Sequence, residues 1–190
     1  MIRVVLAAIV GGVLLFVWGF VSHMVLPFSK DAMKQLPNEQ IVLSTLQTNL
    51  PERGVYFFPG MDMSKQPTPE EQKAWEAKVA SGPSGLLVYR PNGGTVIGAR
   101  PLVAEFITNL LAALVAALVL LGIRGGYGAR VFTVTALGLV AWLSVSVSEW
   151  IWYGFSTPFL IADLVDQLGG WLLAGFGMAA MLKPKRTRGF

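Results

Sequence analysis

The sequence predicts an α-helical integral membrane protein with four transmembrane helices and a small α+β extracytoplasmic domain inserted between helices 1 and 2. The 190-residue chain is 54% hydrophobic and only 14% charged, and its mean hydropathy of +0.58 is far above that of a soluble domain. Four apolar runs each approach or exceed the roughly 20 residues that a membrane-spanning helix needs. The expected parts are helix 1 at 1–28, the outer domain at 29–99, helices 2, 3 and 4 at 100–123, 131–154 and 157–182, and a basic tail at 183–190.

The first apolar run could be mistaken for a secretory signal, because Arg3 precedes it. Its apolar core is longer than the roughly 7 to 15 residues of a signal sequence, and Ser22-His23-Met24 offers no cleavage site with small residues. We therefore expect an uncleaved membrane anchor.

The basic residues that flank the helices predict the orientation of the chain. They fall on one side of the membrane if both termini are cytoplasmic: Arg3, Arg124, Arg130, Lys183, Lys185, Arg186 and Arg188. Segment 29–99 is then outside, and the net charge of +4 is mainly a topology signal. The basic tail is short and has no recognition motif, which argues against a nucleic-acid partner. The expected location is a bacterial inner membrane, with lipid and other membrane subunits as partners.

The outer segment is expected to alternate helices and strands. Thr68, Pro69 and Glu71 form a typical helix start, with an N-cap, a proline at the first helical position and a capping glutamate. A unit of about 70 residues is marginal for an independent core, so we expect it to lean on the membrane helices or on a partner. The expected elements are a helix at 37–50, a strand at 55–58, a helix from Thr68 to about Ala80, and strands at 86–90 and 95–97.

Each transmembrane helix carries one stripe of small, polar or aromatic residues at helical spacing. Small residues allow close helix contact, and polar residues in lipid prefer the bundle interior, so we expect each stripe to face inward. The stripes are Gly12, Phe16, Gly19 and His23 on helix 1; Glu105, Asn109, Ala112 and Ala116 on helix 2; Trp142, Ser146, Glu149 and Tyr153 on helix 3; and Asp163, Gln167, Gly170, Ala174 and Gly177 on helix 4, with Asp166 at its edge.

At about 1.5 Å of rise per residue, polar side chains of separate helices reach a similar depth near the outer side. An ionised carboxylate at that depth is costly unless it is paired, hydrated or protonated. These groups either bond one another, with arginine as counter-charge, or hold a proton or cation, or line a polar substrate cavity, or bind a metal. The predicted polar intramembrane site comprises Glu105, Asn109, Glu149, Asp163, Asp166, Gln167, His23 and Arg100.

The sequence assigns no cofactor. The absence of cysteine excludes disulfides, thiol catalysis and thiolate metal sites. Carboxylates with one histidine suit a hard or borderline metal, but no Glu-x-x-His or His-Glu-x-x-His spacing is present. Copper is a further hypothesis, because thioethers suit Cu(I) and His23 and Met24 adjoin while Met61 and Met63 lie in the outer segment.

The leading functional hypothesis is a non-enzymatic subunit or scaffold of a membrane complex, because the chain is small and has no catalytic motif. The first alternative is a proton- or cation-coupled transport component that uses Glu105, Glu149, Asp163 and Asp166. The second alternative is a metal-dependent membrane enzyme.

Overall fold

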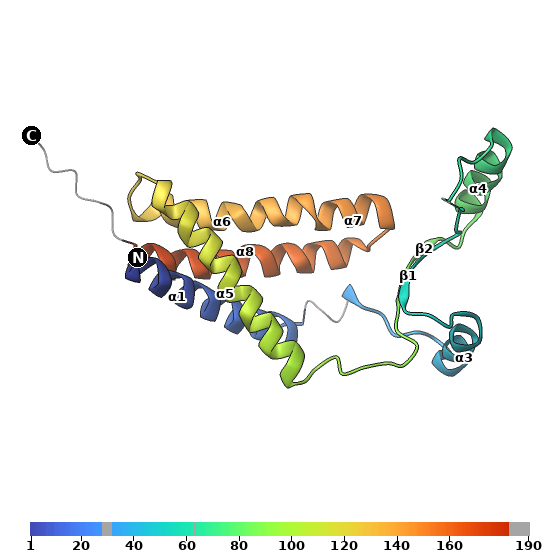
Figure 1. Ribbon diagram of the computed structural model, residues 1–190, viewed down its shortest axis with the longest axis horizontal. Helices are drawn as coiled ribbons and strands as arrows, with labels where there is room; N and C mark the ends of the chain where they lie inside the picture. The colour runs from blue at the N-terminus through green and yellow to red at the C-terminus, as the bar shows by residue number, and fades with distance from the viewer. Residues whose placement is uncertain (28–31, 63, 183–190) are drawn as a thin grey trace, which may run out of the picture. The chain divides into compact units, whose positions relative to one another are not determined.

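The computed structural model describes residues 1–27, 32–62 and 64–182, and the chain divides into two compact units (Figure 1). Unit 1 contains Met1–Lys34, Val96–Trp150 and Phe155–Phe190, and unit 2 contains Gln35–Thr95 with Ile151–Gly154. The predicted basic tail, Met63 and the first residues of the predicted outer domain lie outside the described residues.

The chain is mostly helical, and four stretches are long and apolar enough to cross a membrane: Ile2–Val25, Ala99–Gly122, Tyr127–Tyr153 and Thr157–Met181. This confirms the predicted helical organisation at the level of segments. The elements that form these stretches are α1 (Ile2–Phe20) with the π-helical turn η1 (Val21–Val25), α5 (Ala99–Gly122), α6 (Tyr127–Ser144) with α7 (Ser146–Tyr153), and α8 (Thr157–Met181).

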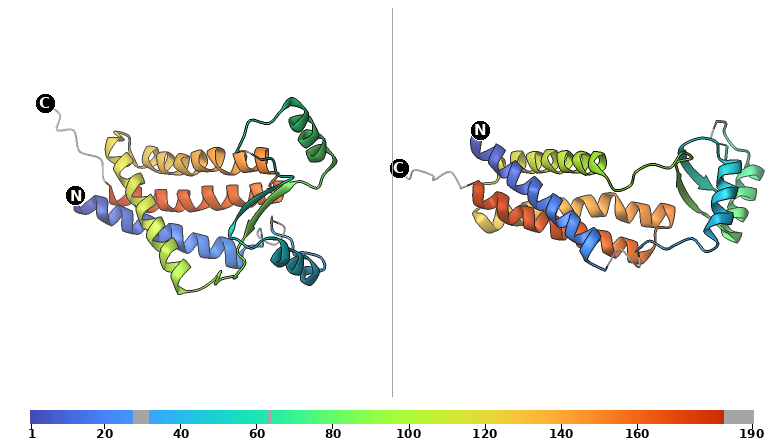
Figure 2. Two further views of the ribbon diagram at one scale, coloured as in Figure 1. Left: turned by 45° about the vertical axis from the view of Figure 1, so that its right-hand side comes forward. Right: turned by 90° about the horizontal axis from the view of Figure 1, so that it is seen from below.

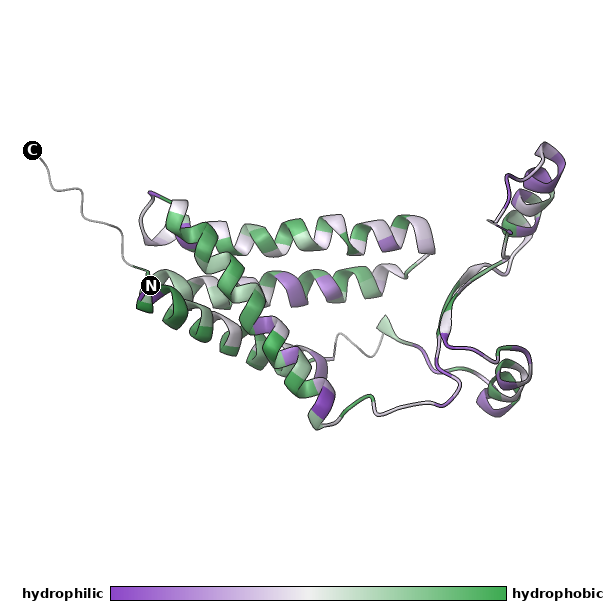
Figure 3. Cartoon of the chain, viewed as in Figure 1, coloured by the Kyte–Doolittle hydropathy of each residue, from purple (hydrophilic) through white to green (hydrophobic). Residues whose placement is uncertain are grey.

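Hydrophobic residues are spread along all of these helices (Figure 3), and many of them are exposed. Exposed examples are Val5 and Ile9 on α1, Val115 and Leu118 on α5, and Val140 on α6. Soluble monomers rarely expose large continuous apolar surfaces, so this exterior is compatible with an integral membrane protein.

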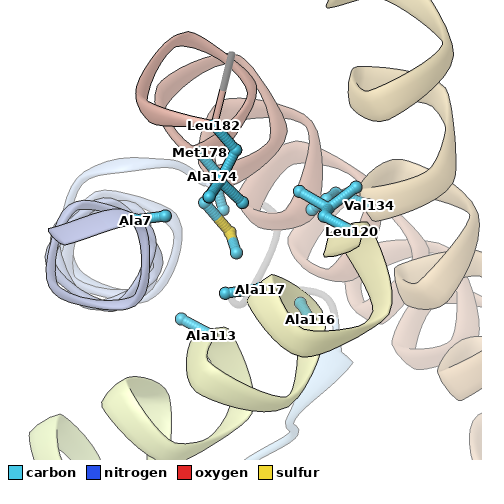
Figure 4. Packing of buried hydrophobic residues seen from close by; sticks show 9 residues of the cluster. All are labelled: Ala7, Ala113, Ala116, Ala117, Leu120, Val134, Ala174, Met178 and Leu182. Atoms are coloured by element: carbon cyan, nitrogen blue, oxygen red, sulfur yellow. The ribbon is translucent and has the colours of Figure 1, made fainter. Parts of the chain in front are cut away.

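Small side chains form the core of unit 1 and let the helices approach closely. The buried cluster consists of Ala7, Ala113, Ala116, Ala117, Leu120, Val134, Ala174, Met178 and Leu182 (Figure 4). Gly12 of α1 lies against α5, where an added Cβ would be 2.8 Å from the Cα of Leu110. Phe16 meets Phe106 edge to face, with ring centroids 5.3 Å apart. The predicted inward stripes of helices 1, 2 and 4 therefore take part in helix packing.

The third candidate span differs from the predicted continuous helix at 131–154. It begins at Tyr127, and Val145 (φ −107°) interrupts it between α6 and α7. The Ser144 hydroxyl donates to the carbonyls of Val140 at 2.7 Å and Ala141 at 3.2 Å. Hydroxyls that bond back to the preceding helical turn often accompany bends in helices, and these bonds lie directly before the interruption.

Helix α8 returns antiparallel to α6 after a short link. The Ser156 hydroxyl accepts a hydrogen bond of 3.3 Å from the backbone N–H of Phe159, and a proline follows at the start of the helix. The predicted hairpin between helices 3 and 4 is present, since α6 and α8 pack against each other.

Unit 2 contains α3 (Glu39–Asn49), β1 (Gly54–Phe58), α4 (Pro69–Ser81) and β2 (Gly85–Tyr89). The strands form a two-stranded antiparallel sheet in which Val55 lies opposite Val88. The predicted order of helix, strand, helix and strand is confirmed. The predicted strand at 95–97 is wrong. A turn at residues 91–92 is closed by a 3.0 Å bond from the Gly93 N–H to the Arg90 carbonyl, Gly93 and Gly94 follow with φ of 63° and 145°, and bends at residues 96–98 lead into α5.

Unit 2 buries very little of its surface. Tyr89 is its only residue of the buried class among the described residues of Gln35–Thr95. Val55 and Val88, which face each other on one side of the sheet, are 65% and 71% exposed. Trp75 ties α4 to the end of β1 through a 2.8 Å bond from its Nε1 to the carbonyl of Pro59. A unit with this little core is marginal by itself.

The predicted start of α4 is confirmed in detail. The Thr68 hydroxyl accepts a bond of 3.2 Å from the Glu71 N–H, and the Glu71 carboxylate accepts one of 2.9 Å from the Thr68 N–H. These reciprocal bonds satisfy two donors that a helix start leaves free. Lys65 adds a third contact, with its Nζ 2.9 Å from Oε1 of Glu71.

The capping carboxylate gives unit 2 a defined response to acid. The hydrogen bond from the Thr68 N–H, followed by the one from Lys65, lowers the pKa of Glu71 below its ordinary value of 4.5. A lowered pKa in the folded state means that the stabilising contribution is present above pH 4.5 and is lost as the pH falls through the lowered value. We expect α4 to fray at its start in that acidic range, with a Glu71 carboxyl titration midpoint below 4.5 by NMR.

Lys65→Gln is the matched variant for this measurement. It should move the Glu71 midpoint part of the way back, because the larger contribution from Thr68 remains. A Glu71 midpoint at or above 4.5 in the unmodified protein would contradict the capping geometry.

Candidate functional site

Unit 1 contains a pocket of about 580 Å³ between α1 with η1, α5 and α8. This volume lies in the range of roughly 300–1,000 Å³ that is typical of small-molecule sites. The residues that line it are Leu15, Phe16, Trp18, Gly19, Phe20, His23, Met24, Val96, Ile97, Pro101, Leu102, Glu105, Asn109, Asp166, Gln167, Gly170 and Trp171.

Helix α5 runs obliquely to α6 and α8 in the view of Figure 1, and Figure 2 shows the same helices from two further sides. Helix α1 packs against both α5 and α8. In the buried core, Met178 of α8 lies in one cluster with Ala113 and Ala117 of α5 (Figure 4). Toward the start of α5 the pocket separates the two helices. The small-residue core therefore closes one end of unit 1, and the pocket opens at the other.

His23 of η1 and Asp166 of α8 lie next to each other in the wall of the pocket. The His23 Nδ1 lies 3.9 Å from Oδ1 of Asp166 and 3.0 Å from the carbonyl oxygen of Gly19. A carbonyl can only accept, so Nδ1 carries the proton that it donates to Gly19, and Nε2 is left available. The side chain of His23 is 62% exposed and that of Asp166 is 22% exposed.

The Asp166 carboxylate has an oxygen that lacks a hydrogen-bond donor within the part of the chain that the structure describes. Its Oδ1 atom is buried and has no hydrogen-bond partner among the described residues. A buried acceptor without a partner is destabilising by roughly 1–3 kcal/mol, and more when it is charged. The site therefore favours a positive charge or a donor next to this carboxylate.

Trp18 positions Asp166 from the side of α1. Its Nε1 donates a 2.9 Å bond to the backbone carbonyl of Asp166, and its ring lies over two adjacent glycines of α8. A Cβ on Gly170 would lie 3.0 Å from Cδ1 of Trp18, and one on Gly169 would overlap the ring. Only glycine lets the indole approach the helix backbone this closely.

The opposite wall carries the second carboxylate. The Asn109 amide donates a 3.2 Å bond to Oε1 of Glu105, one turn earlier on α5. On α8, Nε1 of Trp171 donates a 3.3 Å bond to Oε1 of Gln167. Glu105 is exposed, so its second carboxylate oxygen remains free to meet a ligand.

The structure brings together part of the predicted polar site. His23, Glu105, Asn109, Asp166 and Gln167 line one pocket. Glu149, Asp163 and Arg100 do not line it. Arg100 is exposed, and it forms no ion pair within the described ranges, so the suggested counter-charge for the carboxylates is not observed there.

Asp163 has a different partner. It accepts a hydrogen bond from the hydroxyl of Ser146, a buried residue at the start of α7. The neighbouring Ser144 and Ser148 hydroxyls donate to backbone carbonyls. Of these hydroxyls, that of Ser146 therefore joins the third and fourth spans, and the other two bond within the third span.

The aromatic walls of the pocket were not among the predicted site residues. Trp18, Trp171, Phe16 and Phe20 all line the pocket. A usable signal was present in the sequence, because Trp171 lies four residues after Gln167, and Trp18 directly precedes Gly19 of the stripe on helix 1. Bulky rings at these positions complete an apolar cavity with a few polar groups, which is the usual composition of ligand sites.

The metal hypotheses gain no support from the part of the chain that is described. No group of three or more His, Cys, Asp or Glu side chains there could hold a metal ion. Of the proposed copper ligands, Met24 lines the pocket beside His23, Met61 belongs to unit 2, and Met63 lies outside the described residues.

The chain matches no protein-family model, no curated protein and no solved structure. The site is therefore interpreted from its own geometry.

Proposed function

We propose that this protein is a non-enzymatic subunit or scaffold of a complex in a bacterial inner membrane, with both termini cytoplasmic and unit 2 outside. The observation that carries the proposal is the exposed sheet of unit 2, which leaves Val55 and Val88 uncovered side by side. A marginal unit with an exposed apolar face gains stability when a partner covers that face. Such a sheet can also accept an added strand at a free edge.

The orientation in this proposal is supported by the basic residues of unit 1. Arg3 precedes the buried Ala7 of α1, and Arg124 follows the buried Leu120 of α5; both of these core residues belong to the same cluster. Arg130, near the start of α6, belongs to the same end. Basic residues at the ends of spans favour the cytoplasmic side.

The test is photo-crosslinking of the full chain in its native membrane. A photo-reactive amino acid at Val88 should crosslink one defined membrane protein, and the same group at Ile41, an exposed residue of α3, should not. Val55→Lys should abolish the crosslink from position 88, because a charge on the opposing residue disrupts an apolar interface. Purification as a monomer that turns over a substrate, with no crosslink from position 88, would refute the proposal.

The second candidate function is a proton- or cation-coupled transport component. Of the four acidic residues suggested for this function, Glu105 and Asp166 line the pocket, so we assign the ion-binding role to these two. Carboxylates and a histidine within membrane-spanning helices are typical of ion pathways. Ion flux in proteoliposomes should then fall strongly in the Glu105→Gln, Asp166→Asn double variant. Unchanged flux in that variant would exclude this function.

A further inference from the structure

We propose that the pocket of unit 1 binds a lipophilic organic cation: a positively charged group attached to an apolar or aromatic body. This inference goes beyond both functions proposed above, because equilibrium binding requires neither a partner protein nor flux. It rests on the charge of the pocket, on the orientation of its amides and on its apolar walls.

The charged groups of the pocket favour a cation. Glu105 on α5 and Asp166 on α8 belong to different walls, and no Lys or Arg is present among the lining residues that the structure describes. The remaining titratable lining residue, His23, already donates its Nδ1 proton to Gly19 and presents Nε2. A positive group between the two walls would therefore meet two carboxylates.

The hydrogen bonds within the pocket leave carboxylate oxygens available to a cation. The Asn109 amide donates to one oxygen of Glu105, and the indole N–H groups of Trp18 and Trp171 donate to the backbone carbonyl of Asp166 and to the side-chain oxygen of Gln167. Within the described ranges the second oxygen of Glu105 accepts no hydrogen bond, and Oδ1 of Asp166 is buried without a partner. Such acceptors bind cations and donors.

The walls favour an organic cation over a hydrated inorganic ion. The rings of Trp18, Trp171 and Phe20 line the pocket together with aliphatic side chains. Aromatic faces attract a cation that has lost its water, whereas an inorganic ion needs a shell of several oxygen ligands. No cluster of three ligating side chains is found in the described part of the chain. The volume of about 580 Å³ accommodates an organic body.

The test uses tetraphenylphosphonium and tetraphenylborate, which share a shape and carry opposite charges. The full chain is placed in nanodiscs of zwitterionic lipid, and binding is measured by equilibrium dialysis against empty nanodiscs and by tryptophan fluorescence. We expect saturable binding of tetraphenylphosphonium above the level of empty nanodiscs and no such excess for tetraphenylborate. Equal binding of the two ions would overturn the proposal, because it would reflect apolar partitioning alone.

Two kinds of variant distinguish the contribution of the carboxylate charges to binding from the contribution of the pocket volume. Glu105→Gln with Asp166→Asn should weaken tetraphenylphosphonium binding by about tenfold or more, the factor expected when charge-assisted contacts are lost. Glu149→Gln removes a carboxylate that does not line the pocket and should leave affinity unchanged. Gly19→Leu keeps both carboxylates and adds a side chain at a residue that lines the pocket, where a Cβ meets nothing within 4 Å; it should weaken binding by reducing the space for the ligand. Unchanged affinity in the charge variant or in Gly19→Leu would overturn the proposal.

Discussion

Gly12→Ala is expected to destabilise the packing of α1 on α5 by about 1–3 kcal/mol, the usual range for overpacking a close contact. The added Cβ would lie 2.7 Å from Cδ2 of Leu110 and 2.8 Å from its Cα. The side-chain atom can rotate away, but the Cα belongs to the backbone of α5, so the two helices must separate. The measurement is the midpoint of thermal unfolding of the purified protein in one detergent.

Gly19→Ala on the same helix is the matched control. A Cβ there meets nothing within 4 Å, so the midpoint should stay within the error of the wild-type value or rise slightly through helix propensity. An equal loss in both variants would mean that the close approach at Gly12 does not determine stability.

Ser146→Ala is expected to destabilise the contact between the third and fourth spans by roughly 1–3 kcal/mol, the cost of leaving a buried acceptor unsatisfied. The Ser146 hydroxyl is a donor to the carboxylate of Asp163, and Ser146 is buried. Removal of the Ser146 hydroxyl leaves the half-buried carboxyl group of Asp163 without that hydrogen-bond donor. The same unfolding assay measures the loss.

Two further variants test whether the pair itself is responsible. Ser148→Ala removes a hydroxyl that donates only to the carbonyl of Ser144 and should cost little. Asp163→Leu in the Ser146→Ala background should recover part of the loss, because removing both partners avoids the unsatisfied acceptor. Strictly additive losses in the double variant would show that the two side chains are not coupled.

The elements of this fold were predictable where the signal is local. Apolar runs of about 20 residues define the spans, and Thr68 with Glu71 defines the start of α4 through bonds three residues apart. The interruption at Val145 was not predicted, because the apolar run continues through it without a glycine or proline. The strand expected at 95–97 is absent because bends at residues 96–98 lead the chain into α5.

The sequence predicts how deep the residues of the candidate site lie along their helices, but not the direction in which their side chains point around the helix axis. Sequence position gives the height of a residue along a helix, and Glu105, Asp166 and His23, which were expected at a similar depth, line one pocket. It does not say which neighbour each side chain meets. Asp163 and Asp166 are less than one turn apart, yet the side chain of one meets Ser146 and that of the other meets His23 of η1. The oblique course of α5 depends on contacts between helices far apart in the sequence and is not encoded in any single stretch.

The π-helical turn at Val21–Val25 limits which changes in chain length the first span can tolerate. The Leu26 N–H bonds the carbonyl of Val21 at 3.0 Å, five residues earlier, and such a turn is equivalent to an ordinary helical turn with one inserted residue. Deletion of a residue between Phe20 and His23 would remove the inserted residue and shorten the four-residue spacing between Gly19 and His23, on which the 3.0 Å bond from Nδ1 to the Gly19 carbonyl depends. Descendants of this chain that keep the imidazole opposite Asp166 are therefore expected to tolerate substitutions in this turn but not deletions.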